Sequence, residues 1–169
     1  MATVCYDEIL KYAAGKEILD IGSCGNQGEE TKTKTLFTLL KERAKSVTGV
    51  DIESDSPEIL QGNAENIHLN TKFELVVAGD VIEHLHNPGQ FLDNMHRHLQ
   101  PNGYLILVTP NVKSPAYLLF RGNKFHTCWY CRHTLRYLVE QHGFKVERVT
   151  TGIRRRKNVF HDLMRSAVA

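Results

Sequence analysis

The 169-residue sequence contains no apolar run close to the roughly 18 residues that a membrane-spanning helix needs, so no transmembrane segment is predicted. Its first residues lack a basic stretch followed by an apolar one, which argues against a secretory signal. The net charge is +2, and this balance gives no indication of nucleic-acid binding. No repeat, low-complexity tract or linker interrupts the chain. We therefore expect one domain over residues 1–169, located in the cytoplasm, a monomer or homodimer with no nucleic-acid partner.

The chain has few cysteines, and the four that it has are scattered. A domain of this length builds a hydrophobic core without disulfides, so reduced thiols are the simpler expectation. Two of them, Cys128 and Cys131, share an eight-residue segment with His126 and His133. A structural zinc site normally draws its ligands from two separated pairs, and the chain has no second pair. A redox pair would be expected after a strand rather than after a loop, so neither zinc nor dithiol chemistry is predicted here.

Strand-like and helix-like runs alternate along the whole sequence. Between the second and third strands, a weaker stretch is predicted to hold a short helix at residues 57–61 and a small strand near Ile67. Strands that alternate with helices pair in parallel through right-handed crossovers, which gives a doubly wound α/β sheet with helices on both faces. Ligands bind such sheets in the loops at the carboxyl ends of the strands. The main strands are predicted at residues 17–22, 46–51, 72–79, 104–109 and 144–150, and the helices at residues 7–14, 29–44, 88–99 and 134–142.

The loop after the first strand, DIGSCGNQG at residues 20–28, contains three glycines that let a ligand approach the backbone closely. Their spacing is not the G-x-G-x-x-G of dinucleotide-binding folds. Glu29 and Glu30 occupy the first turn of the next helix, where they complement its dipole, and Asp20 adds a third carboxylate. A pyrophosphate would meet like charge here, whereas a ligand that carries an ammonium and a sulfonium would not.

Asp51 ends the second predicted strand. Related α/β folds place an acid at this position, where it accepts hydrogen bonds from ribose hydroxyls. The alternative is that Asp51 caps the next segment. Together with the glycine loop, the position favours the ribose role.

Several ordered motifs together resemble the class I S-adenosylmethionine-dependent methyltransferases, most closely the small ubiquinone- and menaquinone-biosynthesis-like branch. The resemblance covers residues 15–150 and implies a Rossmann-like, mostly parallel sheet of six or seven strands. The family's glycine loop usually reads D-x-G-C-G-x-G, and the present loop is shifted by one residue. The matching segments are EILDIG (17–22), VTGVD (47–51), GNAE (62–65), FELVVAGDVIEH (73–84) and GYLILVTPN (103–111).

The family usually ends in an antiparallel hairpin formed by its last two strands. Only residues 151–169 remain here for a seventh strand, and residues 161–168 look more helical than extended. We therefore expect the C-terminal hairpin to be short or incomplete, with any seventh strand confined to residues around 158–160.

The resemblance implies S-adenosylmethionine as the cofactor and assigns its parts to positions in the chain. The carboxypropyl group would lie over the glycine loop, the ribose on Asp51 and the adenine near Ile52, Asn63 and Ala64. Asp80 lies in the loop where cofactor and substrate should meet. The predicted cofactor-binding residues are therefore Asp20, Gly22, Ser23, Gly25, Asp51, Ile52, Asn63, Ala64 and Asp80.

Methyl transfer from a sulfonium needs an aligned nucleophile and a dry pocket, and it needs a base only where the acceptor must lose a proton. His84 follows a predicted strand, and His126 precedes Trp129 and Tyr130, which resemble a pocket-lining segment of the family. We therefore predict an enzyme with His84 and His126 as catalytic residues and a small molecule as methyl acceptor. The alternative for His84 is that it braces the following helix.

Two other functions stay open. A cofactor-binding domain without chemistry of its own would serve as a regulatory or partner subunit. Small-RNA 3′-end ribose methyltransferases carry an acid-x-x-Glu-His pattern that binds a divalent ion together with a later histidine, and Asp80, Glu83, His84 and His126 resemble it. Since the sequence lacks the other RNA-binding features of that family, no metal is predicted.

Overall fold

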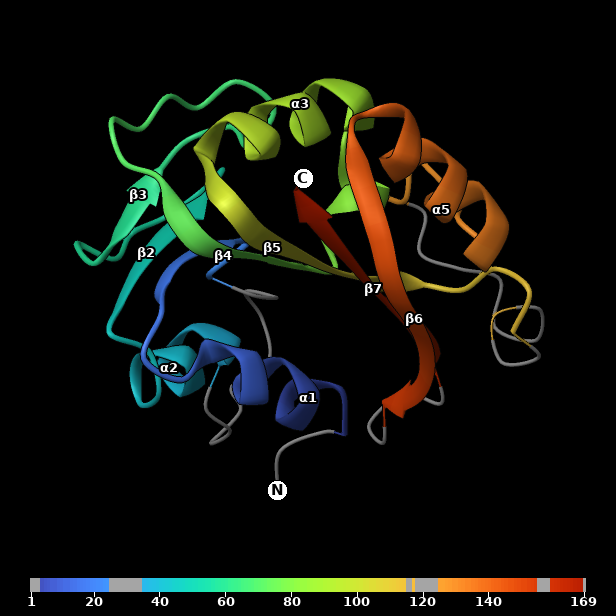
Figure 1. The fold of residues 1–169 in the computed structure, drawn as a ribbon, viewed down its shortest axis with the longest axis horizontal. Coiled ribbons are helices and arrows are strands. Elements are labelled where there is room, and N and C mark those ends of the chain that lie inside the picture. The colour runs from blue at the N-terminus through green and yellow to red at the C-terminus, as the bar shows by residue number, and fades with distance from the viewer. Residues whose placement is uncertain (1–3, 25–34, 115–116, 118–124, 155–158, 169) are drawn as a thin grey trace.

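A computed structural model describes residues 4–24, 35–114, 117, 125–154 and 159–168 (Figure 1). Helices and strands alternate through most of the chain, and the last two elements are strands. The elements are α1 (Val4–Ala13), β1 (Glu17–Ile21), α2 (Leu36–Lys41), β2 (Ser46–Asp51), β3 (Ile59–Gln61), β4 (Phe73–Gly79), the 3-10 turn η1 (Ile82–His84), α3 (Pro88–His98), β5 (Leu99–Pro110), α5 (Arg132–Gln141), β6 (Phe144–Arg154) and β7 (Val159–Val168).

All seven strands form one sheet in the order β3-β2-β1-β4-β5-β7-β6. The five strands from β3 to β5 pair in parallel, and β7 is antiparallel to both of its neighbours. From β1, the chain moves outward to β2 and β3 and then returns to the other side of β1 as β4. The carboxyl ends of β1 and β4 therefore form the point where the winding reverses, which is where ligands bind in such sheets. The predicted doubly wound, mostly parallel sheet is confirmed.

The C-terminal hairpin differs from the prediction. Strand β7 has ten residues and pairs along its length with β5 on one side and β6 on the other. Residues 161–168 are therefore extended rather than helical, and the expectation of a short or incomplete hairpin is not met. The physical reason lies in the edge of β5, whose backbone N–H and C=O groups need partners that a helix could not provide.

Two shorter elements also correct the prediction. Residues Ile59–Gln61 form a strand parallel to β2, where a short helix was expected. Near Ile67 the chain turns instead of forming a strand, because the Ile67 amide donates to the carbonyl of Asn63 at 2.7 Å. Of the helix expected at residues 29–44, the structure describes α2. Thr35 caps this helix, because its hydroxyl accepts a hydrogen bond from the Thr38 amide. Residues 29–34 lie outside the described residues.

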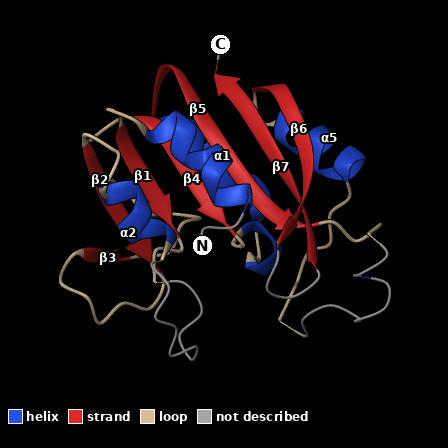
Figure 2. Ribbon diagram, turned by 90° about the horizontal axis from the view of Figure 1, so that it is seen from below, coloured by secondary structure: helices blue, strands red, loops and turns tan. Residues whose placement is uncertain are grey.

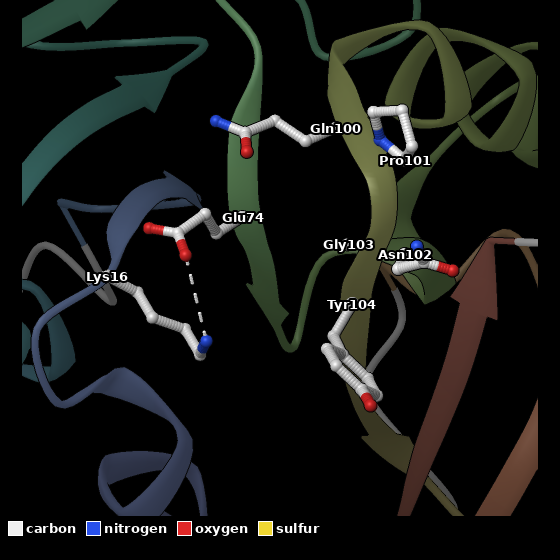
Figure 3. Close-up of a pocket in the computed structure, with 7 residues that line it drawn as sticks. All are labelled: Lys16, Glu74, Gln100, Pro101, Asn102, Gly103 and Tyr104. Atoms are coloured by element: carbon white, nitrogen blue, oxygen red, sulfur yellow. Dashed lines mark ion pairs between the residues drawn. The ribbon is translucent and has the colours of Figure 1, made fainter.

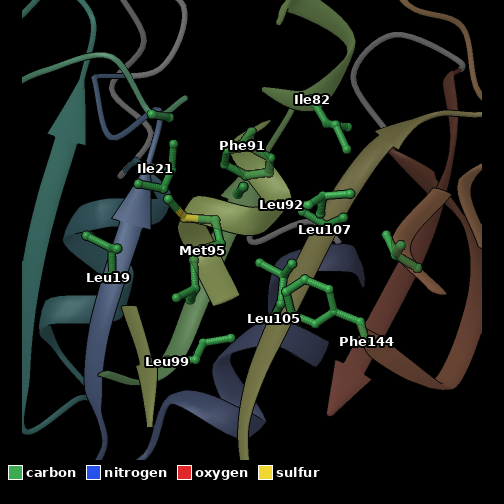
Figure 4. Close-up of a cluster of buried hydrophobic side chains, with 14 of the residues drawn as sticks. Leu19, Ile21, Ile82, Phe91, Leu92, Met95, Leu99, Leu105, Leu107 and Phe144 are labelled. Atoms are coloured by element: carbon green, nitrogen blue, oxygen red, sulfur yellow. The ribbon is translucent and has the colours of Figure 1, made fainter. Parts of the chain in front are cut away.

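The core has two layers, one on each face of the sheet. Helices α1 and α2 cover one face, and α3 and α5 cover the other (Figures 1 and 2). Neighbouring residues of one strand point to opposite layers: Leu75 and Val77 pack on the α1 side, whereas Val76 and Ala78 pack on the α3 side. Figure 4 shows how Phe91 and other side chains of α3 meet side chains of the strands. These long apolar runs explain why the central strands could be predicted from the sequence.

Helix α3 begins as predicted, with Asn87 as its cap and Pro88 in its first turn. The Asn87 side chain accepts a hydrogen bond from the Gln90 amide at 3.0 Å. This start fixes where the loop after β4 must end. No helix in the described part of the chain is long and apolar enough to cross a membrane.

Candidate functional site

The glycine loop turns sharply at the end of β1. Gly22 has a φ of +79°, and its amide donates to the carbonyl of Val50 at 2.8 Å. A Cβ at Gly22 would lie 2.6 Å from Cγ2 of Val81, in the loop after β4. Both the backbone angle and the close approach therefore require glycine at this position. The turn brings the loop after β1 directly against the loop after β4, where Asp80 has a φ of +56°.

Asp51 connects the glycine loop to the segment after β2. Its Oδ2 accepts a hydrogen bond from the Cys24 amide at 2.9 Å, and its Oδ1 accepts one from the Glu53 amide at 3.3 Å. Its carbonyl accepts from the Gly62 amide at 2.8 Å. An ionised carboxylate offers about four acceptor positions, so these two amides leave room for ribose hydroxyls. The bond to Glu53 shows that Asp51 also caps the next segment, so the two predicted roles are compatible.

The expected adenine side contains an exposed apolar side chain. Ile52 is 65% exposed, which is high for isoleucine, and Ala64 nearby in the fold is buried. The Asn63 side chain accepts from the Glu65 amide at 2.9 Å, which fixes the turn at residues 63–65. The Gly62 amide bond to Asp51 holds this turn close to Ile52. A flat aromatic base would cover the exposed isoleucine.

Asp20 is a buried carboxyl group below the glycine loop and is only 2% exposed. Burial raises its pKa to about 7, although the nearby Ser23 hydroxyl lowers it and the charge of Asp51 raises it further. Ser23 itself is buried, and its hydroxyl donates to the Asp20 carbonyl at 2.7 Å. Within the described residues, Oδ2 of Asp20 has no hydrogen-bond partner. A cationic group of a ligand above the loop would therefore favour the ionised carboxylate.

The predicted cofactor-binding residues that the structure describes lie in the last residues of strands β1 and β2 or in the segments that follow β1, β2, β3 and β4, at positions 20, 22, 23, 51, 52, 63, 64 and 80. Gly25 lies outside the described residues, and so do Glu29 and Glu30. The part of the loop that was expected to be shifted by one residue therefore stays a prediction.

The loop after β4 contains a buried acid, Glu83, which is 2% exposed. Its carboxylate Oε2 accepts a hydrogen bond from the hydroxyl of Thr109, at the end of β5, at 2.9 Å. Its main-chain carbonyl accepts from the amides of Thr127 and Cys128 at 2.8 and 3.0 Å. One residue therefore joins the ends of β4 and β5 to the segment before α5.

The two predicted catalytic histidines lie against each other. The rings of His84 and His126 are 4.7 Å apart between centroids and nearly perpendicular, at 83°. His84 Nδ1 lies 3.1 Å from the carbonyl of Phe125. Because a carbonyl can only accept, Nδ1 carries the proton and Nε2 of a neutral His84 has the lone pair. The site therefore offers an oriented proton acceptor on an exposed ring.

His126 is more buried than His84. Burial lowers its pKa, the charge of His84 lowers it further, and the charge of Asp80 acts in the opposite direction. Its Nδ1 is buried and has no hydrogen-bond partner within the ranges that the structure describes. The lowered pKa favours the neutral form of His126.

Three side chains of this site could hold a metal ion together. Single ligand atoms of Glu83, His84 and His126 lie within 4.8 Å of one another. Two imidazoles and one carboxylate suit divalent transition metals. Among the described residues, Asp80, Cys128 and Cys131 are not part of this group. Cys131 instead precedes α5 as its capping residue, with its amide bonded to the Thr134 hydroxyl.

The aromatic pair after His126 is split between inside and outside. Tyr130 is 7% exposed, and burial raises its pKa, whereas Trp129 is 64% exposed. Side chains in this extended stretch alternate in direction, because Phe125 and Trp129 are exposed while His126 and Tyr130 are not. Tyr130 therefore packs inside while Trp129 lies at the surface beside it, and the pocket-lining role of the pair stays a prediction.

A shallow pocket lies at the other end of the sheet, near the amino-terminal ends of β1 and β4 (Figure 3). Lys16 and Glu74 form an ion pair of 3.8 Å at its wall. Its volume is about 90 Å³. It lies at the opposite ends of the strands from the histidines and the glycine loop.

Residues 1–149 match the family described as the methyltransferase domain. The chain belongs to this family. It is 30% identical over 128 residues to the ubiquinone biosynthesis O-methyltransferase of Rickettsia canadensis. The alignment covers 68% of this chain and 49% of that protein. The chain thus spans about half of the length of this relative.

Two solved methyltransferase structures share the fold. One is the 1,6-didemethyltoxoflavin-N1-methyltransferase of Burkholderia thailandensis, with a TM-score of 0.76, 16% identity and coverage of 98% of this chain and 77% of the other. The second is the N-methyltransferase NodS of Bradyrhizobium japonicum, with a TM-score of 0.72, 15% identity and coverage of 97% and 85%. Both were solved with S-adenosylhomocysteine. At this identity, the likeness shows the fold alone, and the predicted methyltransferase fold is confirmed.

Proposed function

We propose that the chain is an S-adenosylmethionine-dependent methyltransferase of small molecules, with residues 1–169 as one domain. The observation that carries this proposal is the convergence, at the point where the sheet reverses its winding, of the Gly22 turn, the Asp51 carboxylate and the His84–His126 pair. Membership of the family and the solved complexes with S-adenosylhomocysteine support the same cofactor.

In this proposal, the loops at the ends of β1 and β2 bind the nucleoside and the amino-acid part of the cofactor. Asp51 accepts hydrogen bonds from the ribose hydroxyls, and Ile52, Asn63 and Ala64 surround the adenine. Asp20, Gly22 and Ser23 support the amino-acid part, where a cation would stabilise the ionised Asp20. Asp80 borders the space next to the sulfur. The chain thereby orients the methyl group towards the histidines.

His84 then acts as the proton acceptor for an acceptor molecule that must be deprotonated. The acceptor atom forms a bond to the methyl carbon, the bond between carbon and sulfur breaks, and its electron pair stays on the sulfur. The proton leaves the acceptor atom for Nε2 of His84, whose Nδ1–H remains bonded to the Phe125 carbonyl. His126 lies against this ring and helps to exclude water.

Calorimetry with S-adenosylhomocysteine tests the cofactor, and NADH is the matched negative ligand. Binding of the first ligand alone supports the proposal, and binding of NADH alone would overturn it. Methyl transfer to a panel of phenols, carboxylic acids and amines then tests catalysis. A chain that binds S-adenosylhomocysteine but transfers no methyl group to any of them would instead be a regulatory or partner domain.

A second candidate function rests on the Glu83–His84–His126 group. We propose that a divalent ion bound there would act as a Lewis acid on an acceptor hydroxyl, such as the terminal ribose of an RNA. Titration with Mn²⁺ or Co²⁺ tests the ion, with Glu83→Gln as the variant and Glu140→Gln, an exposed acid on α5, as the control. A stoichiometric site lost only in Glu83→Gln favours this function, and methyl transfer unaffected by a chelator argues against it.

A further inference from the structure

Residues 83–85 and residues 125–127 hold each other through reciprocal hydrogen bonds. His84 Nδ1 donates to the Phe125 carbonyl at 3.1 Å, and the Thr127 amide donates to the Glu83 carbonyl at 2.8 Å. The Thr127 hydroxyl lies 2.7 Å from the Leu85 carbonyl. Thr127 thus bonds to Glu83 and Leu85, the two neighbours of His84 in the sequence. Thr127 is itself the residue after His126.

The Thr127 hydroxyl has a single hydrogen to donate. Its oxygen lies 2.7 Å from the Leu85 carbonyl, 3.2 Å from the Glu83 carbonyl and 4.0 Å from the Cys128 sulfur. The shortest distance assigns the hydrogen to Leu85. The Glu83 carbonyl already accepts two amides. The Cys128 thiol also lies 3.7 Å from the Leu85 carbonyl, a longer and weaker contact than that of the Thr127 hydroxyl. The hydroxyl therefore makes the shorter bond from this segment to Leu85, which no backbone amide of the segment makes.

Position 127 is exposed, so its side chain contributes little to the apolar core. Within the described residues, its hydrogen-bond partners are groups of the loop after β4 and the adjacent Cys128. The segment keeps other bonds when the hydroxyl is lost: the Cys128 amide donates to the Glu83 carbonyl at 3.0 Å, and the Tyr130 carbonyl accepts from the Val112 amide at 2.9 Å. Loss of the hydroxyl would therefore loosen the region of His126 without removing the segment from the protein.

We infer that Thr127 is a positioning residue for methyl transfer, because its hydroxyl bond to Leu85 sets the placement of His126 against His84. The inference rests on the proposed function. A displacement of about 1 Å at a reacting group can lower the rate by roughly 10²-fold, so a single hydroxyl far from the core can matter for turnover.

The test compares Thr127→Val, which keeps the shape but removes the hydroxyl, with Thr127→Ser, which keeps the hydroxyl. Thr38→Val is the matched control, because the exposed Thr38 hydroxyl also donates to a main-chain carbonyl, that of Thr35 at 2.8 Å, but on α2. We expect kcat to fall roughly 10- to 100-fold in Thr127→Val. The affinity for S-adenosylhomocysteine should stay unchanged there, while Thr127→Ser and Thr38→Val should retain turnover.

A second measurement does not depend on activity. Nuclear Overhauser effects between the ring protons of His84 and His126 should be present in the original chain and in Thr127→Ser, and should weaken in Thr127→Val. Unchanged kcat, or an unchanged Overhauser effect, in Thr127→Val would overturn the positioning role. If the original chain binds S-adenosylhomocysteine but transfers no methyl group, the proposed function fails, and the Overhauser comparison alone decides whether Thr127 places the rings.

Discussion

The hydroxyl of Thr109 donates a 2.9 Å hydrogen bond to the carboxylate of Glu83, and both side chains are almost completely buried. The two residues belong to different elements, the end of β5 and the turn η1. A buried carboxylate that loses a donor retains the full cost of its desolvation. This bond therefore supports the acid at the centre of the candidate site.

We predict that Thr109→Val lowers the free energy of unfolding by about 1–3 kcal/mol, because it leaves Glu83 with one donor fewer in a buried environment. Thr109→Ser should restore most of the loss, since it keeps the hydroxyl. Urea unfolding measures both variants. Equal stability of Thr109→Val and the original chain would mean that Glu83 is supported in another way.

Asp51→Ala should weaken the binding of S-adenosylhomocysteine by roughly 10- to 150-fold, as expected for the loss of about 1.5–3 kcal/mol of hydrogen bonds to a charged group. Calorimetry measures the affinity. Asp55→Ala removes an exposed acid four residues away and serves as the control. Unchanged affinity in Asp51→Ala would place the ribose elsewhere.

Gly22→Ala should impair both the fold and the cofactor site. The positive φ alone costs roughly 1–2 kcal/mol for an L side chain, and the new methyl group would meet Val81 at 2.6 Å. The double variant with Val81→Ala should recover only the part due to the close contact. Thermal unfolding with and without S-adenosylhomocysteine separates the effect on the fold from the effect on the cofactor site. The same substitution at Gly79, which has room for a methyl group, is the control.

The buried Asp20 predicts a stability that falls as the pH rises. Its pKa is about 7 in the folded chain and 3.8 as an ordinary aspartate, so between these values the folded state holds a proton that the unfolded state has lost. Folding then takes up a proton, and the contribution of Asp20 to stability decreases through this range. Asp20→Asn should therefore gain stability relative to the original chain near pH 8 and not near pH 4. Denaturant unfolding at both pH values checks this difference, and a constant difference would contradict it.

His84→Ala and His126→Ala should leave the affinity for S-adenosylhomocysteine nearly unchanged. If the acceptor must lose a proton, turnover should fall by roughly 10²–10⁴ in His84→Ala. His86→Ala, an exposed histidine two residues further on, is the control. Full turnover in both site variants would remove them from the list of catalytic residues and leave catalysis to alignment and desolvation. A lower melting temperature with retained turnover would give His84 the bracing role only.

Local patterns were sufficient to predict most of the fold. The apolar run at residues 73–79 predicts β4 because both faces of a central parallel strand are buried, and the Asn87–Pro88 pair predicts the start of α3. The first motif and Asp51 could be placed because the motif contains an apolar strand that ends in a glycine turn and Asp51 ends the next strand. The prediction failed for β7, whose extended state depends on two partner strands rather than on its own sequence.

The site could be predicted only in part, because it too depends on contacts between residues far apart in the sequence. The two histidines were found because each belongs to a motif, but their ring contact joins positions 42 residues apart. Thr109 and Thr127 carry no local signal, since their role depends on where β5 and the segment before α5 meet the loop after β4. Burial of a threonine at the end of a strand is visible only in three dimensions.

The outward direction of Trp129 has a practical consequence. This residue is the only tryptophan of the chain, and it is three positions from His126. Its fluorescence therefore comes from a single indole that is attached to the segment carrying the histidine and is open to water. The emission wavelength and its quenching by iodide can report on changes at that segment without a label. The protein thus contains an intrinsic optical probe beside its candidate site.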